Sequence, residues 1–353
     1  MTLLGLRPEQ LATELFEFNR RAAEGIQTLS RIRAVDVGTT PNQVLYRQDK
    51  LQLRYYPPAT PSCKTPLLIV YALVNRPYIL DLQPDRSLIR ALTQRGIPVY
   101  LIDWGYPDQA DRYLDLDDYL NDYLDNCVEQ VKQHAANSKV NLLGVCQGGV
   151  LSLCYSCLHP AKVKNLITLV TPVDFHTCDN VLAALARQID AQQVLDTYGN
   201  FPGPMLTRAY NSLMPMRLGL HKELNLPQQL SNHSNALNYL RMERWINDCP
   251  DLTGAGFKEF LEKFFSANAL VKGGLEIGGQ QVDLHRIKQP LLNLFASKDH
   301  LVPPSASRAL ATLTHSSDYS EKEYPGGHIG VFVGRQAQTV LPEDITAWLQ
   351  QRD

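Results

Sequence analysis

The residue best suited to chemistry in this sequence is a cysteine placed between glycines. It is Cys146, within the segment Gly-Val-Cys-Gln-Gly-Gly at 144–149. The apolar run 140–145 predicts a buried strand and the pattern 150–158 predicts a helix, so Cys146 lies at the turn between them. Gly144 and Gly148 occupy positions where a tight strand-to-helix turn leaves no room for a Cβ. The pattern predicts a nucleophile elbow, where N–H groups at the helix start stabilise a thiolate. The alternative is a packed, inert cysteine.

Two downstream residues could complete a catalytic triad with Cys146. Asp299 follows the apolar run 291–296, which predicts a strand, and His328 lies in the glycine-rich segment 324–330. The chain order nucleophile, acid after a late strand, and histidine after the last strand is typical of the α/β-hydrolase fold. We therefore predict that His328 takes the proton from Cys146, that Asp299 orients the imidazole, and that the thiolate attacks an acyl carbonyl.

Three other residues near these positions were considered for the acid or an accessory role. Asp103 and Asp174 also follow predicted strands, but they come too early in the chain order for the triad acid. His300, next to Asp299, either orients the acid or the substrate, or has a structural role.

An acyl-transfer site also needs two donors for the oxyanion. We predict that one is the backbone N–H of Gln147, directly after the nucleophile. The other is expected in the loop after the first main strand, at Val74 or Asn75.

The remaining pattern supplies elements that position these residues. Strands are predicted at 44–46, 51–55, 67–74, 99–103, 140–145, 163–170 and 291–296, and helices at 8–32, 87–94, 116–136, 150–158 and 341–349. The first two strands form a hairpin. The later strands are almost continuously apolar, as strands covered on both faces should be. The pattern predicts an α/β fold with a mostly parallel sheet flanked by helices.

The alternation of strands and helices stops between 175 and 289, where helical patterns are broken by prolines. We predict that this insertion is a helical cap over the carboxyl ends of the strands, where the site of an open α/β sheet lies. A separate helical domain is the alternative. The chain then divides into an N-terminal helical segment (1–40), a core (41–174 and 290–353) and a cap (175–289). The N-terminal helix could cover the sheet or dock a partner.

Composition narrows the function classes. The chain has 353 residues, of which 44% are hydrophobic and 20% charged, so it can form one large domain with an insertion. A net charge of -2 offers no basic field for nucleic acid, and no segment resembles a signal peptide or a membrane span. Seven cysteines without framework spacing indicate a reducing, cytoplasmic location. Cys154 and Cys157 are predicted to pack within a helix, and no metal or cofactor is expected.

Cysteine in place of the more usual serine favours acyl transfer. A thioester at Cys146 keeps the acyl group activated, so exchange with a thioester substrate is nearly neutral and later transfer to a hydroxyl is downhill. Some hydrolases of this fold also use cysteine, so hydrolysis stays open.

These segments resemble those of the polyhydroxyalkanoate synthases. The similarity is carried by 144–149 and by Tyr-Ala-Leu-Val-Asn-Arg-Pro at 71–77, Asp-Trp-Gly at 103–105, Thr-Pro-Val-Asp at 171–174 and Tyr-Pro-Gly-Gly-His at 324–328. It extends from the first main strand to the C-terminus. The chain length and Gln147 are most similar to the catalytic subunit of the class III enzymes, which work with a second, non-catalytic subunit.

The resemblance implies roles for the triad and a substrate. Cys146 would hold the growing chain, His328 would activate it, and Asp299 would be the acid and help to activate the incoming hydroxyl. The substrate would be an (R)-3-hydroxyacyl-coenzyme A, usually short-chain such as 3-hydroxybutyryl-coenzyme A, with release of coenzyme A. The polyester would be stored in cytoplasmic granules. The implied active form is a homodimer or hetero-oligomer, with a cap that gates entry.

Two other functions are compatible with the same residues. A cysteine-dependent α/β-hydrolase or acyl-coenzyme A thioesterase would use the same triad with water as acceptor. A non-catalytic granule or scaffold protein is disfavoured by an intact Cys146, Asp299 and His328 in the correct order.

Overall fold

The computed structural model describes residues 8–213, 221–334 and 338–353. The chain folds into two compact units. One comprises Met1–Val37 and Thr207–Asp248, and the other comprises Gly38–Leu206 and Cys249–Asp353. Each unit has its own packing and is described separately below.

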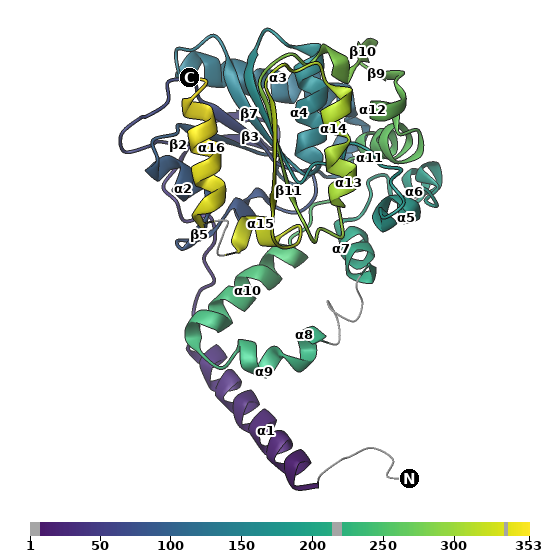
Figure 1. The fold of residues 1–353 in the computed structure, drawn as a ribbon. Coiled ribbons are helices and arrows are strands. Elements are labelled where there is room, and N and C mark those ends of the chain that lie inside the picture. Colours follow the sequence, from purple (N-terminus) through teal and green to yellow (C-terminus); the bar gives the residue numbers. More distant parts are fainter. Residues whose placement is uncertain (1–7, 214–220, 335–337) are drawn as a thin grey trace. The chain divides into compact units, whose positions relative to one another are not determined.

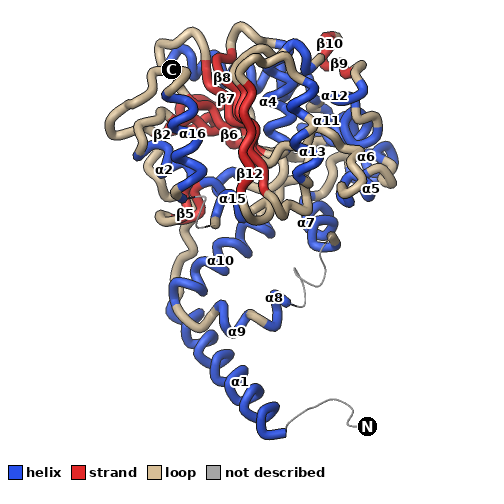
Figure 2. Tube along the Cα trace, viewed as in Figure 1, coloured by secondary structure: helices blue, strands red, loops and turns tan. Residues whose placement is uncertain are grey.

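The larger unit is built on an eight-stranded sheet with the order β1-β2-β6-β3-β7-β8-β11-β12 (Figure 2). Its strands are β1 (Gln43–Gln48), β2 (Leu51–Tyr56), β3 (Leu67–Val70), β6 (Val99–Asp103), β7 (Val140–Val145), β8 (Val163–Leu169), β11 (Leu291–Ala296) and β12 (Tyr319–Tyr324). The hairpin β1-β2 is antiparallel and β2 is antiparallel to β6, whereas β6 to β12 run parallel. The sheet is therefore mostly parallel, as predicted. Two small hairpins, β4 (Asp81–Gln83) with β5 (Arg86–Ser87) and β9 (Leu275–Ile277) with β10 (Gln280–Val282), lie outside it.

Helices cover both faces of this sheet. On one face α3 (Asp125–His134) and α4 (Gln147–Leu158) pack on side chains such as Leu68, Tyr100 and Leu142. Successive side chains of a strand point to opposite faces, so every second residue packs on the other face of the sheet. There α2 (Leu88–Gln94) and α16 (Val340–Gln350) lie side by side (Figure 1). Two buried faces explain why the central strands are apolar along their whole length.

The remaining helical elements of the larger unit are short. They are η1 (Pro77–Leu80), η2 (Gln109–Tyr113), η3 (Asp118–Leu124), α5 (Val181–Ala186), α6 (Ala191–Tyr198), α11 (Gly254–Phe260), η5 (Leu261–Ser266), α12 (Ala269–Lys272), η6 (Leu284–Arg286), α13 (Pro304–Arg308), α14 (Leu310–Leu313) and α15 (Gly330–Val333). The helix α7 (Gly203–Ser212) crosses from this unit into the smaller one. The elements η3 and η5 are π-helical. The first leads directly into α3, and the second directly follows α11.

The smaller unit consists of α1 (Pro8–Arg31), α8 (His221–Leu224), α9 (Leu226–Gln229) and α10 (His233–Asn247), together with the last part of α7. The helix α1 packs against α9 and α10, with Gly25 close to Leu230. Arg241 and Arg244 of α10 donate to backbone carbonyls of the segment after α1, at 2.8 and 2.7 Å. The helix predicted at 8–32 is thus present, and it also exposes large apolar side chains, among them Phe16 and Ile26.

The predicted cap, 175–289, is divided between the two units. Residues 207–248 fold with the N-terminal segment, and the rest folds with the sheet. Within the larger unit, this remainder forms a second apolar cluster of Ala186, Ala191, Phe201, Leu252, Phe257 and Leu261. The assignment of 175–289 to a single cap over the strand ends stays a prediction.

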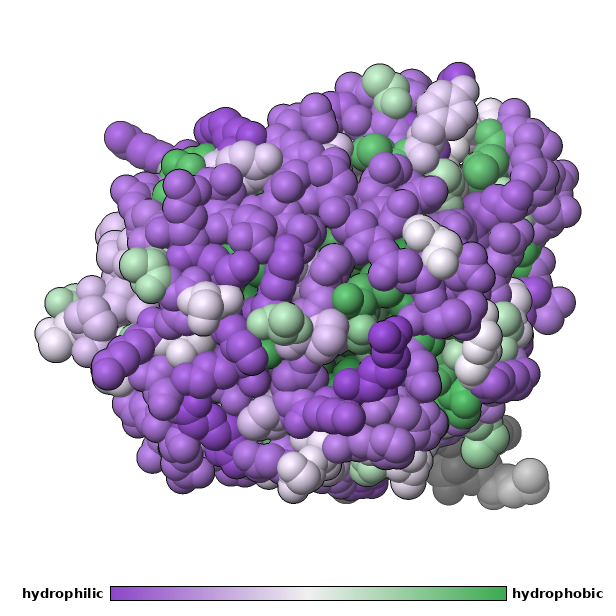
Figure 3. Space-filling model, turned by 90° about the horizontal axis from the view of Figure 1, so that it is seen from above, coloured by the Kyte–Doolittle hydropathy of each residue, from purple (hydrophilic) through white to green (hydrophobic). Residues whose placement is uncertain are grey.

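The helices and one face of the surface lack membrane-like features in the part of the chain that the structure describes. Of the helices that the structure describes, none combines the length and the hydrophobicity needed to cross a membrane. Figure 3 shows one face on which hydrophilic side chains predominate and hydrophobic ones form small separate areas. That face therefore carries no broad apolar patch of the kind that marks an interaction surface.

Candidate active site

Cys146 lies at the turn between β7 and α4, where its backbone has φ 55° and ψ -121°. A positive φ with this ψ is costly for a residue that carries a Cβ, and such strain persists only where the surroundings enforce it. Two backbone hydrogen bonds do so here. Cys146 donates its N–H to the carbonyl of Leu169 at 2.9 Å, and its own carbonyl accepts from Gly149 at 2.9 Å. The predicted nucleophile elbow is therefore present as a strained turn.

Three glycines let the neighbouring chain segments approach this turn. A Cβ at Gly144 would lie 2.4 Å from the Cα of Gly149, and one at Gly148 would lie 2.1 Å from the carbonyl oxygen of Val70. A Cβ at Gly149 would lie 1.8 Å from Oγ1 of Thr171. These distances are far below van der Waals contact, so a side chain at any of the three would push strands or loops apart. The glycines thus bring the ends of β3, β7 and β8 together at the start of α4.

Asp299 and His328 meet because β11 and β12 are parallel neighbours. Ala296 at the end of β11 pairs with Tyr324 at the end of β12. The pairing continues beyond the strands, since Ser297 and Lys298 donate to the carbonyls of Tyr324 and Gly326, both at 2.8 Å. Asp299 comes three residues after the end of β11, and His328 comes four residues after the end of β12. The parallel pairing thus places the acid and the histidine at the same edge of the sheet.

The carboxylate of Asp299 is fixed at both oxygens. Its Oδ1 accepts the N–H groups of Leu301 and Val302, each at 2.9 Å, and its Oδ2 accepts Nδ1 of His328 at 2.6 Å. Both side chains are buried. Because the carboxylate can only accept, Nδ1 carries the proton and Nε2 is left to act as the base. Cys146 lies close enough to the imidazole to raise its pKa. The structure therefore brings Cys146, His328 and Asp299 together in the predicted order.

The electrostatics favour a charged imidazole. Burial alone would lower the pKa of His328, but the negative charges of Asp299 and Cys146 and the hydrogen bonds to both outweigh it. The net effect raises the pKa of His328 from 6.5 to about 10. An imidazolium between two anions is the species that forms when the histidine takes a proton from the thiol, so the site stabilises that state.

The loop after β3 also reaches the start of α4. Gln147 is the first residue of α4, and its side-chain Oε1 accepts the N–H of Leu73 at 3.1 Å. The N–H groups of Val74 and Gln147 have no hydrogen-bond partner within the described part of the chain. Asn75 has a positive φ of 57°. Val74, Asn75 and Gln147 thus remain the predicted oxyanion donors, and the free N–H of Val74 favours Val74 over Asn75.

The other acidic candidates have structural partners. Asp103 forms a buried ion pair with Arg76 at 2.7 Å, and Arg76 also donates to the carbonyl of Gly105 at 2.5 Å. Asp174 accepts from the side chain of Asn268 at 2.9 Å. These partners suit roles in holding loops. His300 is half-buried beside Asp299, and its accessory role stays a prediction.

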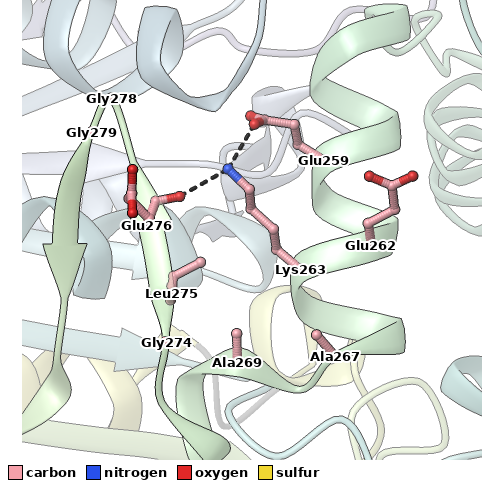
Figure 4. Close-up of a pocket in the computed structure, with 10 residues that line it drawn as sticks. All are labelled: Glu259, Glu262, Lys263, Ala267, Ala269, Gly274, Leu275, Glu276, Gly278 and Gly279. Atoms are coloured by element: carbon pink, nitrogen blue, oxygen red, sulfur yellow. Dashed lines mark hydrogen bonds and ion pairs between the residues drawn. The ribbon is translucent and has the colours of Figure 1, made fainter.

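Cys154, Cys157 and one surface hollow have structural explanations in the part of the chain that the structure describes. Cys154 and Cys157 are buried in α4, and burial raises the pKa of Cys157 to about 12, as expected for packed, unreactive thiols. The described residues contain no group of three side chains that could hold a metal. One hollow has a volume of about 450 Å³, and Lys263 in its wall donates to the carboxylate of Glu259 at 2.6 Å and to the carbonyl of Glu276 at 2.8 Å. Figure 4 shows Lys263 between these two residues. This bridge ties η5 to β9, and no triad residue lines the hollow.

Two elements of the site were not evident from the sequence. The strand β12, which places His328, reads Tyr-Ser-Glu-Lys-Glu-Tyr and has no apolar pattern. The side-chain contact between Gln147 and Leu73 joins residues far apart in the chain. The sequence signal for this contact was the expectation that the loop after the first main strand and Gln147 both supply oxyanion donors.

Comparison with known proteins agrees with this geometry. Residues 65–335 match the family described as alpha/beta hydrolase fold, and residues 28–92 match the one described as Poly-beta-hydroxybutyrate polymerase (PhaC) N-terminus. The solved Paleococcus ferrophilus monoacylglycerol lipase aligns with a TM-score of 0.56 at 18% identity, covering 86% of this chain and 100% of that one. At that identity the likeness shows the fold alone, and with the family match it confirms the predicted α/β-hydrolase fold.

Two curated relatives extend over the whole length. The chain is 49% identical to the "Poly(3-hydroxyalkanoate) polymerase subunit PhaC" of Allochromatium vinosum, over 99% of both chains. It is 46% identical to the protein of the same name from Thiocystis violacea, over 100% of both. On this evidence the chain belongs to the PhaC family of poly(3-hydroxyalkanoate) polymerase subunits.

Proposed function

We propose that this enzyme polymerises (R)-3-hydroxyacyl-coenzyme A into a polyhydroxyalkanoate through a thioester at Cys146, with release of coenzyme A. Family membership supports the polymerase activity. The observation that carries the mechanism is the His328 imidazole, held by Asp299 at Nδ1 and close enough to Cys146 for the two side chains to interact electrostatically. This is the geometry in which a histidine activates a nucleophile.

The first step transfers the acyl group to the enzyme. His328 takes the proton of the Cys146 thiol at Nε2, and the sulfur attacks the carbonyl carbon of the substrate thioester. The carbonyl oxygen becomes an oxyanion, which the N–H groups of Gln147 and Val74 are placed to stabilise. The bond to the sulfur of coenzyme A then breaks, and this sulfur leaves with the proton held by His328. The thioester to coenzyme A is exchanged for a thioester to Cys146, so the free energy of the step is close to zero.

The second step extends the polymer. The hydroxyl of a 3-hydroxyacyl group gives its proton to His328 and attacks the thioester carbonyl. The ester bond forms as the bond between the carbonyl carbon and the Cys146 sulfur breaks, and the released thiolate takes the proton from His328. Asp299 stabilises the imidazolium in both steps, because its carboxylate stays bound to Nδ1. The change from thioester to ester is downhill, which gives the cycle its direction.

Substrate length, partners and location are also part of this proposal. We assign a short-chain substrate such as 3-hydroxybutyryl-coenzyme A, and a place in the cytoplasm at the polyester granule surface. A non-catalytic second subunit is supported by the names of the relatives, which call each of them a subunit. We further propose a homodimer or hetero-oligomer, and a cap from 175–289 that gates entry to the triad.

The experiment is incubation with (R)-3-hydroxybutyryl-coenzyme A, with and without a candidate partner subunit. We expect coenzyme A release together with insoluble polyester. Free 3-hydroxybutyrate without polymer would instead indicate a thioesterase with the same triad. Cys146→Ala should abolish coenzyme A release, while Cys178→Ala, which removes an exposed thiol, should not change it. Unchanged release in the Cys146→Ala variant would exclude the mechanism.

A further inference from the structure

Gln147 connects the two sides of the proposed oxyanion site. Its backbone N–H stands directly after the nucleophile and has no partner in the described residues. Its side chain turns to the loop after β3 and accepts the N–H of Leu73 at 3.1 Å. The side chain is buried, with 9% exposed. Gln147 therefore carries one candidate oxyanion donor and binds Leu73, the residue next to the other candidate donor, Val74.

The loop that carries the second candidate donor is held at several points. Before the donor, the carbonyl of Tyr71 accepts Nε1 of Trp104 at 2.9 Å, and the N–H of Leu73 is bound by Gln147. After the donor, Asn75 takes a left-handed backbone conformation. Between these points the N–H of Val74 is left without a protein partner in the described residues. The loop is thus held on both sides of the Val74 N–H, which remains available for the oxyanion.

The same loop packs against the second apolar cluster. The side chains of Leu73 and Val74 contact the cluster formed by residues 186–261, and Leu73 also contacts the main core. Apolar packing can hold the side chains, but it does not fix the direction of a backbone N–H. The hydrogen bond from Leu73 to Gln147 orients the peptide next to the donor, so it supplies what packing cannot.

We propose that the Gln147 side chain is a positioning residue that sets the direction of the Val74 N–H for the oxyanion. This inference rests on the proposed function, because it assigns a role within the same acyl transfer. Stabilisation by such donors depends on their being aimed beforehand at the place where charge develops. A donor that is tilted away loses much of this effect even though it is still present. The expected loss falls on kcat, since the ground-state carbonyl carries little charge.

The test compares two substitutions at this position. Gln147→Met has similar length and no oxygen acceptor, so it removes only the hydrogen bond. We expect kcat for coenzyme A release to fall about tenfold, less than the 10²–10³ typical of losing a donor outright, with KM changed by less than about twofold. Gln289→Met is the matched control, because the half-buried Gln289 side chain also accepts a backbone N–H, that of Lys288, and donates to the carbonyl of Pro160, but lies outside the proposed site. Its kinetics should equal those of the unmodified enzyme.

The second substitution, Gln147→Glu, keeps an oxygen acceptor. When protonated it resembles glutamine, and when ionised it places a negative charge near the oxyanion. Its kcat relative to the unmodified enzyme should therefore rise as pH falls, whereas the same ratio for Gln147→Met should not depend on pH. The difference in pH dependence between the two variants tests the positioning role even if Gln147→Met has a lowered melting temperature.

The outcomes separate this inference from the function on which it rests. If Gln147→Met retains full kcat, or if both variants are impaired equally at every pH, the side chain only fills space and the inference is wrong. In either case the proposed function stands, provided that Cys146→Ala abolishes coenzyme A release in the same assay. Release that persists in Cys146→Ala would instead overturn the function itself.

Discussion

Replacing Asp299 by asparagine tests the triad most directly, because the structure dictates how the new side chain must sit. Oδ1 of Asp299 accepts two backbone N–H groups, from Leu301 and Val302. An asparagine oxygen can take over this role, which leaves its NH₂ group facing Nδ1 of His328. The reverse orientation would set the NH₂ against two N–H donors. Asparagine therefore makes Nδ1 an acceptor and moves the ring proton to Nε2, where it cannot accept the proton of Cys146.

The size of the effect follows from the lost contacts. The bond between His328 and the Asp299 carboxylate is charge-assisted, and such bonds contribute about 1.5–3 kcal/mol. At 1.36 kcal/mol per factor of ten, this alone lowers kcat about 10- to 100-fold. The wrong tautomer adds to this, and in serine proteases the same substitution costs about 10⁴ in kcat. We expect a fall of about 10³ to 10⁴ for Asp299→Asn.

The assay is the initial rate of coenzyme A release at saturating 3-hydroxybutyryl-coenzyme A. Asp174→Asn is the matched control, since Asp174 also follows a strand and accepts a backbone N–H, that of His176 at 2.8 Å. It should keep kcat within about threefold, as expected for a residue outside the triad. If Asp299→Asn stays within tenfold of the unmodified enzyme with its fold intact, the assignment of the acid is wrong.

Three further predictions concern the elbow and the histidine. Cys146→Ser should be severely impaired in coenzyme A release, because a hydroxyl is far harder to deprotonate than a thiol, and near-normal turnover would contradict the thioester argument. Gly149→Ala places a Cβ 1.8 Å from Thr171 Oγ1 and should lower the free energy of unfolding by about 3 kcal/mol in urea titrations, whereas Gly330→Ala, with open space around it, should not. The pKa of His328 is raised to about 10, so its stabilising contribution is complete below about pH 6.5 and is lost as pH rises toward 10. The free energy of unfolding should therefore fall across that range, and a His328→Gln variant should lack this fall.

The buried parallel strands were the most predictable part of the fold. The strands predicted at 99–103, 140–145 and 291–296 coincide with β6, β7 and β11. An apolar run covered on both faces has one structural solution, and its ends are set by polar or turn residues. The positions of Cys146, Asp299 and His328 at the strand ends were predictable for a related reason. Each follows a strand or a glycine-rich turn, and the order along the chain then fixes which edge of the sheet they reach.

The predicted bounds of strands and helices were wrong where contacts between residues far apart in the chain determine the structure. The strand expected at 67–74 ends at Val70, because the chain there must pass over Gly148 at the start of α4. The helix expected at 116–136 begins with the π-helical η3, whose wider turn the apolar spacing does not reveal. The strand β12 was missed because it lies at the sheet edge with exposed charges, as edge strands often do.

The helical insertion shows a third kind of limit. Within the insertion, the structure forms two short helices in succession, α5 and α6, and Asp190 caps the second by accepting the N–H of Gln193. Aspartate at a helix start is a recognisable signal. That 207–248 fold with the N-terminal segment depends on contacts between α1, α9 and α10, which no local spacing encodes.

The strained turn at Cys146 has a consequence for when the protein can react. Its thiol is one of seven in the chain, and in a nascent polypeptide no histidine stands beside it. The base becomes adjacent only after β11 and β12 have paired, which requires residues up to His328 to have left the ribosome. If Cys146 and His328 act as proposed, a half-made chain cannot capture acyl groups, and the onset of acyl transfer is timed by completion of the sheet.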